Sequence, residues 1–133
     1  MWCHAWIPVY HRTPIIPDRK TFNILPLISM IRVAFKMKLK PGCEAEYQKR
    51  HKAIWPELKK LLVDQGINDY SIFHDAETDI LFAFQKVSGT QGSQDLGNNE
   101  VVKRWWQYMA DIMETNPDHS PVTKHLQEVF HMD

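Results

Sequence analysis

The segment formed by residues 33–40 alternates between apolar and charged side chains, and this alternation limits most strongly how the chain can fold. Apolar residues occupy the odd positions (Val33, Phe35, Met37 and Leu39), and lysines occupy three of the even positions. Side chains of a β-strand point alternately to the two faces of a sheet. The pattern therefore predicts a strand with one buried face, which requires a sheet and a second layer that covers it.

A helix is expected over residues 44–65. Apolar residues recur there at helical spacing: Ile54, Leu58, Leu61 and Leu62. Gly66 follows the last of them and can adopt the left-handed conformation that ends a helix. Pro56 lacks a backbone N–H, so we expect it to remove one hydrogen bond and to bend this helix just after Trp55.

The rest of the chain alternates again between strand and helix patterns. Residues 70–74 and 80–87 are rich in aromatic and branched side chains and flank a polar segment, which predicts a hairpin. Residues 88–99 contain three glycines and predict a loop. A second helix is expected to follow and to end before Asn116; its apolar face is formed by Val101, Trp105, Tyr108, Met109 and Ile112. Residues 126–132 alternate well enough to predict a last strand.

The resulting order is strand, helix, strand, strand, helix, strand. It predicts an α+β fold, the ferredoxin-like βαββαβ sandwich, in which both helices pack on one face of an antiparallel sheet. The segment 80–87 is apolar on both faces, so an uncovered outer face would leave a large apolar patch in water. We therefore expect a homodimer closed sheet to sheet, an assembly of the dimeric α/β-barrel type, with a pocket between each sheet and its helices.

Residues 1–29 differ in composition from the remaining chain. They contain four of the eight prolines and show no sustained helical or strand period. Prolines and polar residues also interrupt every apolar run that a secretory signal would need. We predict that residues 1–29 form an N-terminal extension without a fixed fold, either upstream sequence read through from an early start or a disordered arm. Residues 30–133 are predicted to form the single folded domain.

Charge and motif content exclude several classes of function. The chain carries 16 basic and 16 acidic residues without clusters, so the electrostatic pattern of a nucleic-acid or membrane-surface binder is missing. It has two cysteines, neither of them in a CxxC pair, and no zinc-binding helix motif or glycine-rich phosphate loop. We expect no metal, no cofactor, no membrane contact and a reducing, cytoplasmic environment. A neutral small molecule is the expected ligand.

Three residues of the first predicted helix are candidates for chemistry. Tyr47, His51 and Trp55 are spaced by four residues, so one stripe of a helix would present all three to the same cleft. An imidazole with an ordinary pKa near 6.5 can give and take a proton at neutral pH. The alternative stays open, because a lone histidine on a helix is more often a surface residue or a structural hydrogen-bond partner.

Three further aromatic residues are candidates for ligand binding. Trp105 and Trp106 are consecutive, so they point about 100° apart on a helix, and we expect one of them to face something other than the core. An indole offers a broad apolar face and an N–H donor, which suit the C–H faces and hydroxyls of a sugar. One of the pair can equally belong to the core and the other to a dimer interface. Tyr70 can reach a pocket from a strand end, although a strand tyrosine is more often a core or edge residue.

Three segments of the chain resemble the L-rhamnose mutarotase family. Residues 46–58 (EYQKRHKAIWPEL) are similar to the first-helix signature of the family, and residues 104–113 (RWWQYMADIM) to its second helix. Residues 116–121 (NPDHSP) and 126–130 (LQEVF) resemble its C-terminal segment. The resemblance extends from Met30 to about Met132 and leaves residues 1–29 outside.

The resemblance implies a cytoplasmic homodimer of ferredoxin-like subunits that acts in rhamnose metabolism. Its members are isomerases that interconvert the α and β anomers of L-rhamnopyranose without a cofactor or a metal. By motif position, His51 would be the general acid, and Tyr47, Tyr70, Trp105 and Trp106 would contact the sugar. The resemblance leaves the base unassigned; water, Tyr70 or another residue can serve.

Two other functions remain compatible with the residues. The first is a small cofactor-independent monooxygenase on the same dimeric barrel, in which an aromatic cavity would activate an electron-rich substrate. The second is a sugar-binding module without catalytic activity. Exchange between the anomers of rhamnose separates an isomerase from both.

Overall fold

A computed structural model describes residues 29–133 of the chain. The prediction that residues 1–29 lack a fixed fold lies, apart from Ser29, outside the described residues. Ordered along the chain, the elements are β1 (Ile31–Lys38), α2 (Glu44–Lys52), α3 (Pro56–Asp64), β2 (Ile67–Asp75), β3 (Ile80–Val87), the 3-10 helix η1 (Ser93–Asp95), α4 (Glu100–Met109) and β4 (Lys124–Leu126).

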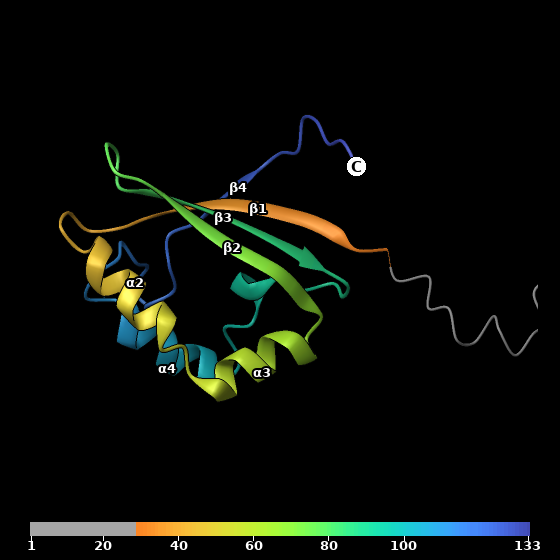
Figure 1. Ribbon diagram of the computed structural model, residues 1–133. Helices are drawn as coiled ribbons and strands as arrows, with labels where there is room; N and C mark the ends of the chain where they lie inside the picture. The colour runs from red at the N-terminus through yellow and green to blue at the C-terminus, as the bar shows by residue number, and fades with distance from the viewer. Residues whose placement is uncertain (1–28) are drawn as a thin grey trace, which may run out of the picture.

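The four strands form one antiparallel sheet in the order β2-β3-β1-β4. The pair β1 and β3 is in continuous register from Ile31 opposite Val87 to Lys38 opposite Ile80. Helices α2, α3 and α4 all lie on one side of the sheet (Figure 1). The architecture is therefore an α+β fold with one sheet layer and one helix layer, as the alternating patterns predict.

The single bent helix expected over residues 44–65 is wrong, because two separate helices occupy this segment. α2 ends at Lys52, and α3 begins at Pro56. Trp55 between them has extended backbone angles, φ −60° and ψ 129°. A proline disfavours the helical conformation of the residue before it, and its own fixed φ suits the first position of a new helix. Pro56 thus starts a helix instead of bending one. Gly66 has a φ of +81° just after α3, as expected for a residue that ends a helix.

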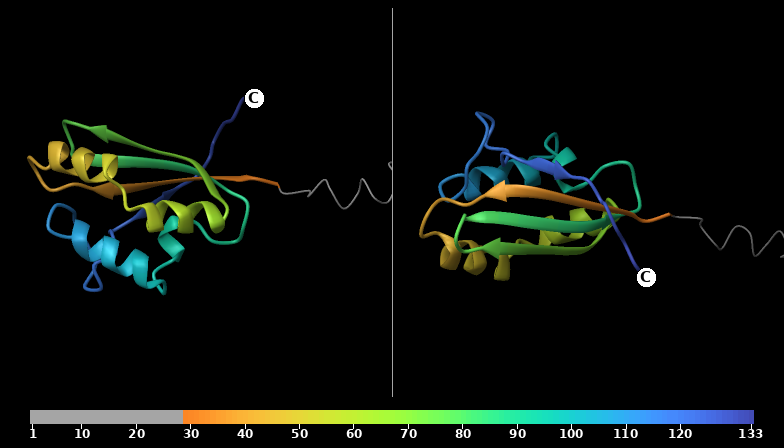
Figure 2. Two further views of the ribbon diagram at one scale, coloured as in Figure 1. Left: turned by 60° about the horizontal axis from the view of Figure 1, so that its bottom comes forward. Right: turned by 90° about the horizontal axis from the view of Figure 1, so that it is seen from above.

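The last predicted strand differs from the structure, and the second helix is shorter than its predicted apolar face. α4 ends at Met109, before Asn116 as expected, but Ile112 lies beyond its end. β4 covers only Lys124–Leu126, whereas residues 127–133 belong to no strand. This segment leaves the sheet on the side away from the helices, as the two views of Figure 2 show. Alternation alone cannot fix a strand, since a strand also needs a partner edge along its whole length.

The core lies between the sheet and the helices. The strands contribute Phe35, Met37, Ile67, Leu81, Ala83 and Val87 to it, and Leu39 joins it directly after β1. On the opposite, outer face, large apolar side chains stay partly in water: Phe73 is 67% exposed and Phe82, its cross-strand partner, is 38% exposed. The prediction that the 80–87 strand is apolar on both faces is confirmed, because Leu81 is buried on the inner face while Phe82 lies on the outer one.

Candidate active site

A cleft of about 1050 Å³ lies between the inner face of the sheet and the helices. This is where the sequence places a pocket, and its volume is at the upper end of the usual range for small-molecule sites. The five candidate site residues all line it: Tyr47, His51, Tyr70, Trp105 and Trp106. They come from α2, β2 and α4, so the fold brings together residues that are up to 59 positions apart.

Tyr47 and His51 form a stacked pair on α2. Their ring centroids are 4.2 Å apart and their planes differ by 28°. The Nδ1 atom of His51 lies 3.0 Å from the carbonyl oxygen of Tyr47. Because a carbonyl oxygen only accepts hydrogen bonds, Nδ1 carries the hydrogen, and the lone pair of the neutral ring is on Nε2. Burial lowers the pKa of His51 from its ordinary 6.5, although the hydrogen bond to Tyr47 opposes this shift. At neutral pH, His51 is therefore a neutral base.

The two phenols that line the cleft stay protonated at neutral pH. Burial is the main cause that raises the pKa of Tyr47, and the nearby Tyr70 adds to it. Burial also raises the pKa of Tyr70, and a hydrogen bond from Ser93 partly offsets the rise. Both side chains thus keep an O–H that can donate a hydrogen bond to a ligand oxygen.

Both indoles of α4 are buried and both line the cleft, so the pair does not divide into one core residue and one residue that faces elsewhere. Trp105 is 7% exposed and Trp106 is 8% exposed. The rings of Trp105 and His51 are nearly perpendicular with centroids 5.4 Å apart, and Trp106 packs over Gly97. The two side chains meet different neighbours: His51 and Trp55 lie against Trp105, whereas Gly97 lies against Trp106.

Trp55 is not on the helical stripe of Tyr47 and His51, since the α2 helix ends before it. It instead packs its ring at 5.1 Å, edge to face, against Trp105. Trp55 therefore supports one wall of the cleft from behind. Together, the cleft offers one neutral imidazole, two phenolic O–H groups and indole surfaces, a set suited to moving a proton between oxygens of a polar, partly apolar ring.

Arg50 is a structural residue of the site that the sequence analysis missed. Its guanidinium forms two hydrogen bonds to Asp111, at 2.7 and 3.1 Å, and donates to the carbonyl oxygen of Tyr108 at 2.7 Å. It also bonds Glu46 one turn earlier and lies 4.5 Å from the centroid of the Tyr108 ring. Arg50 thus ties α2, next to His51, to the end of α4. Its partner Asp111 lies 61 residues later in the sequence, so no local sequence pattern predicts this ion pair.

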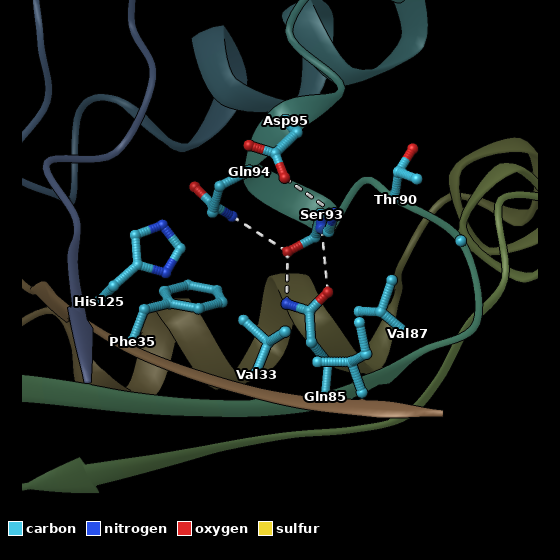
Figure 3. A pocket seen from close by; sticks show the side chains of 12 residues that line it. Val33, Phe35, Gln85, Val87, Thr90, Ser93, Gln94, Asp95 and His125 are labelled. Carbon is cyan, nitrogen blue, oxygen red and sulfur yellow. Dashed lines mark hydrogen bonds between the residues drawn. The ribbon is translucent and has the colours of Figure 1, made fainter. Parts of the chain in front are cut away.

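A second missed feature is the polar turn η1, which separates the cleft from a smaller cavity of about 430 Å³. Ser93 and Gln94 line both spaces. Figure 3 shows the Gln85 side chain rising from β3 to meet Ser93, with Phe35 and His125 at the other end of the smaller cavity. A polar residue at an inward position of β3 is the signal that could have indicated this contact.

Two kinds of feature are absent from the part of the chain that the structure describes. Residues 29–133 contain no group of three or more His, Cys, Asp or Glu side chains arranged to hold a metal ion. Within the same range, no helix combines the length and apolar character needed to cross a membrane.

Comparisons with known proteins agree on one family. A family model described as L-rhamnose mutarotase matches residues 32–132. The chain is 70% identical over 104 residues to an L-rhamnose mutarotase of Bacteroides thetaiotaomicron, and 66% identical over 104 residues to one of Phocaeicola vulgatus. Each match covers 78% of this chain and all of the relative. The crystal structure of L-rhamnose mutarotase from Formosa agariphila resembles this fold with a TM-score of 0.73 at 59% identity, over 77% of this chain and 99% of that one.

Proposed function

The chain belongs to the L-rhamnose mutarotase family, and from this membership we propose that it interconverts the α and β anomers of L-rhamnopyranose. The observation that carries the proposal is the 70% identity to a relative that the chain covers completely. The cleft between the sheet and the helices is the proposed site. We propose a cytoplasmic enzyme that uses neither a cofactor nor a metal.

Anomer exchange needs two proton transfers. The ring opens when a proton is removed from the anomeric hydroxyl and another is delivered to the ring oxygen; the aldehyde then rotates about its C1–C2 bond and closes on the other face. Each transfer by a positioned side chain contributes about 10²- to 10⁴-fold in rate. A group that accepts a proton in the opening step must donate one in the closing step, because the reaction runs in both directions.

His51 is the proposed proton-transfer residue. In its neutral form, with the hydrogen on Nδ1 bonded to Tyr47, the lone pair of Nε2 is the atom that accepts a proton. We propose that neutral His51 takes the proton of the anomeric hydroxyl and that the imidazolium so formed delivers it to the ring oxygen as the ring opens; closure on the other face runs the same two transfers in reverse. The general-acid role implied by the family resemblance then belongs to this second, short-lived form, and the lowered pKa of His51 favours release of the proton.

Tyr47, Tyr70, Trp105 and Trp106 are the proposed sugar-binding residues. The two phenols offer O–H donors to sugar oxygens, and the indoles offer apolar faces to its C–H groups and to the methyl group of rhamnose. An apolar pocket alone rejects a sugar with an added hydroxyl by only about 10²-fold, so paired hydroxyl contacts are needed for finer discrimination.

We further propose that two copies form a ferredoxin-like dimer, closed over the outer faces of their sheets. The strand order β2-β3-β1-β4 and the single helix layer support the ferredoxin-like description. Exposed apolar side chains on the outer face support the closure: Phe73, Phe82 and Leu126. The exposed C-terminal residues Val129, Phe130 and Met132 leave the sheet on this same side and add apolar surface that a second copy would cover.

Saturation-transfer NMR on L-rhamnose tests the proposed activity. Irradiation of one anomeric proton should reduce the signal of the other in the presence of the protein, at a rate above the spontaneous exchange. A sugar-binding module would broaden or shift the signals without transferring saturation, and a monooxygenase would leave them uncoupled. Either result would reject the proposed function.

A further inference from the structure

Gln85 is a polar side chain at a position where the strand pattern calls for an apolar one. It lies on the inner face of β3 between Ala83 and Val87 and is 0% exposed. Burial of an amide is unfavourable unless its hydrogen bonds are made. Its partners therefore show what the side chain does.

Both polar atoms of the Gln85 side chain bond to Ser93. The oxygen Oε1 accepts from the backbone N–H of Ser93 at 2.9 Å, and Nε2 donates to the Ser93 hydroxyl at 2.8 Å (Figure 3). The backbone N–H can only donate, so the amide cannot be turned the other way. The hydroxyl oxygen of Ser93 is consequently an acceptor towards Gln85.

The single proton of the Ser93 hydroxyl is directed towards Tyr70. Its oxygen also accepts from Nε2 of Gln94 at 3.3 Å, and its own O–H points to the hydroxyl oxygen of Tyr70 at 3.4 Å. The Tyr70 oxygen is thus an acceptor towards Ser93, so the single proton of Tyr70 is left for another partner. Tyr70 lines the cleft, and a ligand oxygen there is the partner available.

We propose that Gln85 and Ser93 are positioning residues, which hold the Tyr70 hydroxyl so that it donates, rather than accepts, a hydrogen bond towards a sugar oxygen in the cleft. The inference deepens the proposed function and rests on it for the identity of the sugar. It gives a reason for a fully buried glutamine in the core and for the close approach of η1 to β3. Both act through Tyr70: Gln85 is fully buried and holds Ser93, and Ser93 bonds the Tyr70 hydroxyl.

The direction of the hydrogen bonds can be measured without any activity. Protein labelled with 3-fluorotyrosine is titrated with pH and followed by ¹⁹F NMR, and Tyr70→Phe identifies the Tyr70 signal. A donor at the phenolic oxygen favours the phenolate. Ser93→Ala removes that donor, so the Tyr70 signal should titrate at higher pH, and Gln85→Met should shift it in the same direction. A merely structural role predicts the opposite sign, because loosened packing admits water and lowers a pKa that burial has raised.

The consequence for exchange is tested with a double-mutant cycle. In the wild-type background, which keeps Tyr70, Ser93→Ala should lower kcat/KM for L-rhamnose exchange by about tenfold. In the Tyr70→Phe background, the same substitution should lower it by less than about twofold. The inference would be overturned if the pKa of Tyr70 in Ser93→Ala were unchanged or lowered. It would also be overturned if Ser93→Ala lowered kcat/KM equally in both backgrounds. A wild-type protein without exchange would reject only the proposed function, since the fluorine titration still reads the Ser93 contact.

Discussion

Nδ1 of His51 lies 3.0 Å from the carbonyl oxygen of Tyr47, the residue one helical turn before it. Because the carbonyl oxygen accepts, this contact assigns the hydrogen to Nδ1 and leaves the lone pair on Nε2. The same turn of α2 stacks the two rings with centroids 4.2 Å apart. A spacing of four residues thus fixes the position of the imidazole and also the nitrogen that exchanges protons.

Replacement of His51 tests its part in the proposed reaction. We expect His51→Asn to lower the exchange rate of L-rhamnose anomers by at least about 10²-fold, because a positioned proton acceptor is lost while the fold is kept. His119→Asn is the matched control: His119 lies outside the cleft with a φ of +68°, a conformation that asparagine tolerates. Exchange that survives in His51→Asn at the wild-type rate would remove His51 from the mechanism.

The pH profile distinguishes the base from the acid. Burial lowers the pKa of His51 below 6.5, so the ring is neutral at pH 7 and becomes charged only at lower pH. If the neutral ring accepts the first proton, kcat/KM should be level near pH 7 and fall as the pH drops through this lowered pKa. Activity that instead rises towards acid pH would show that the imidazolium acts first.

The free energy of unfolding should also depend on pH through His51. A histidine whose folded pKa is lowered stabilises the protein above its unfolded pKa of about 6.5, and this contribution is lost as the pH falls. The free energy of unfolding, measured with urea, is therefore expected to decrease in wild type between pH 7 and pH 5 by more than in His51→Asn. Parallel decreases in the two proteins would contradict a buried neutral His51.

The sequence patterns predicted the layers of this fold because they depend on local periods. The alternation over residues 33–40 and the hairpin residues correspond to β1, β2 and β3. The break at Trp55 was missed although its signal is local, since a residue before proline avoids the helical conformation. The end of β4 was missed for another reason: periodicity says which face a residue occupies and nothing about where its partner strand stops.

Contacts within the site were predictable where the two residues share an element and hidden where they do not. The four-residue spacing of Tyr47 and His51 predicted that their side chains lie together, and in the structure the two rings are stacked. The Gln85–Ser93 pair depends on the path of the loop between β3 and η1, which turns the chain back on itself within eight residues. Such a path is decided by tertiary packing, and the one local signal, the polar residue Gln85 at an inward position, was overlooked in a strand described as apolar on both faces.

Removal of the Arg50 guanidinium should loosen the link between α2 and α4. The Arg50 side chain is 11% exposed and bonds both Asp111 and the Tyr108 carbonyl. We expect Arg50→Met to lower the free energy of unfolding by about 1–2 kcal/mol, because charged hydrogen bonds are lost while the apolar stem is retained. Lys49→Met, at the exposed neighbouring position, is the control. Equal unfolding midpoints in urea for the two variants would show that the clamp adds no stability.

A charge on the outer face of the sheet should prevent the proposed dimer. Phe82 lies at the centre of that face, opposite Phe73 on β2 and Lys36 on β1. Phe82→Arg would bury two unpaired charges in a symmetric interface, so we expect a monomer by light scattering where the wild type gives a dimer. Val122→Arg, at a residue that is 44% exposed outside the strands, should leave the dimer intact. A monomeric wild-type protein would reject the sheet-to-sheet assembly.

Gly97 is predicted to control the position of the Trp106 indole. A Cβ atom at residue 97 would lie 2.9 Å from Cζ3 and 3.1 Å from Cη2 of Trp106, closer than packed atoms allow, so the ring must move. Because Trp106 lines the cleft, Gly97→Ala should raise KM for L-rhamnose several-fold and cost about 1–3 kcal/mol of stability through overpacking. Gly89→Ala is the matched control, since its nearest atom would be 3.4 Å away, the carbonyl oxygen of Gln65. KM values that are equal in Gly97→Ala and Gly89→Ala would mean that the sugar does not depend on where this indole sits.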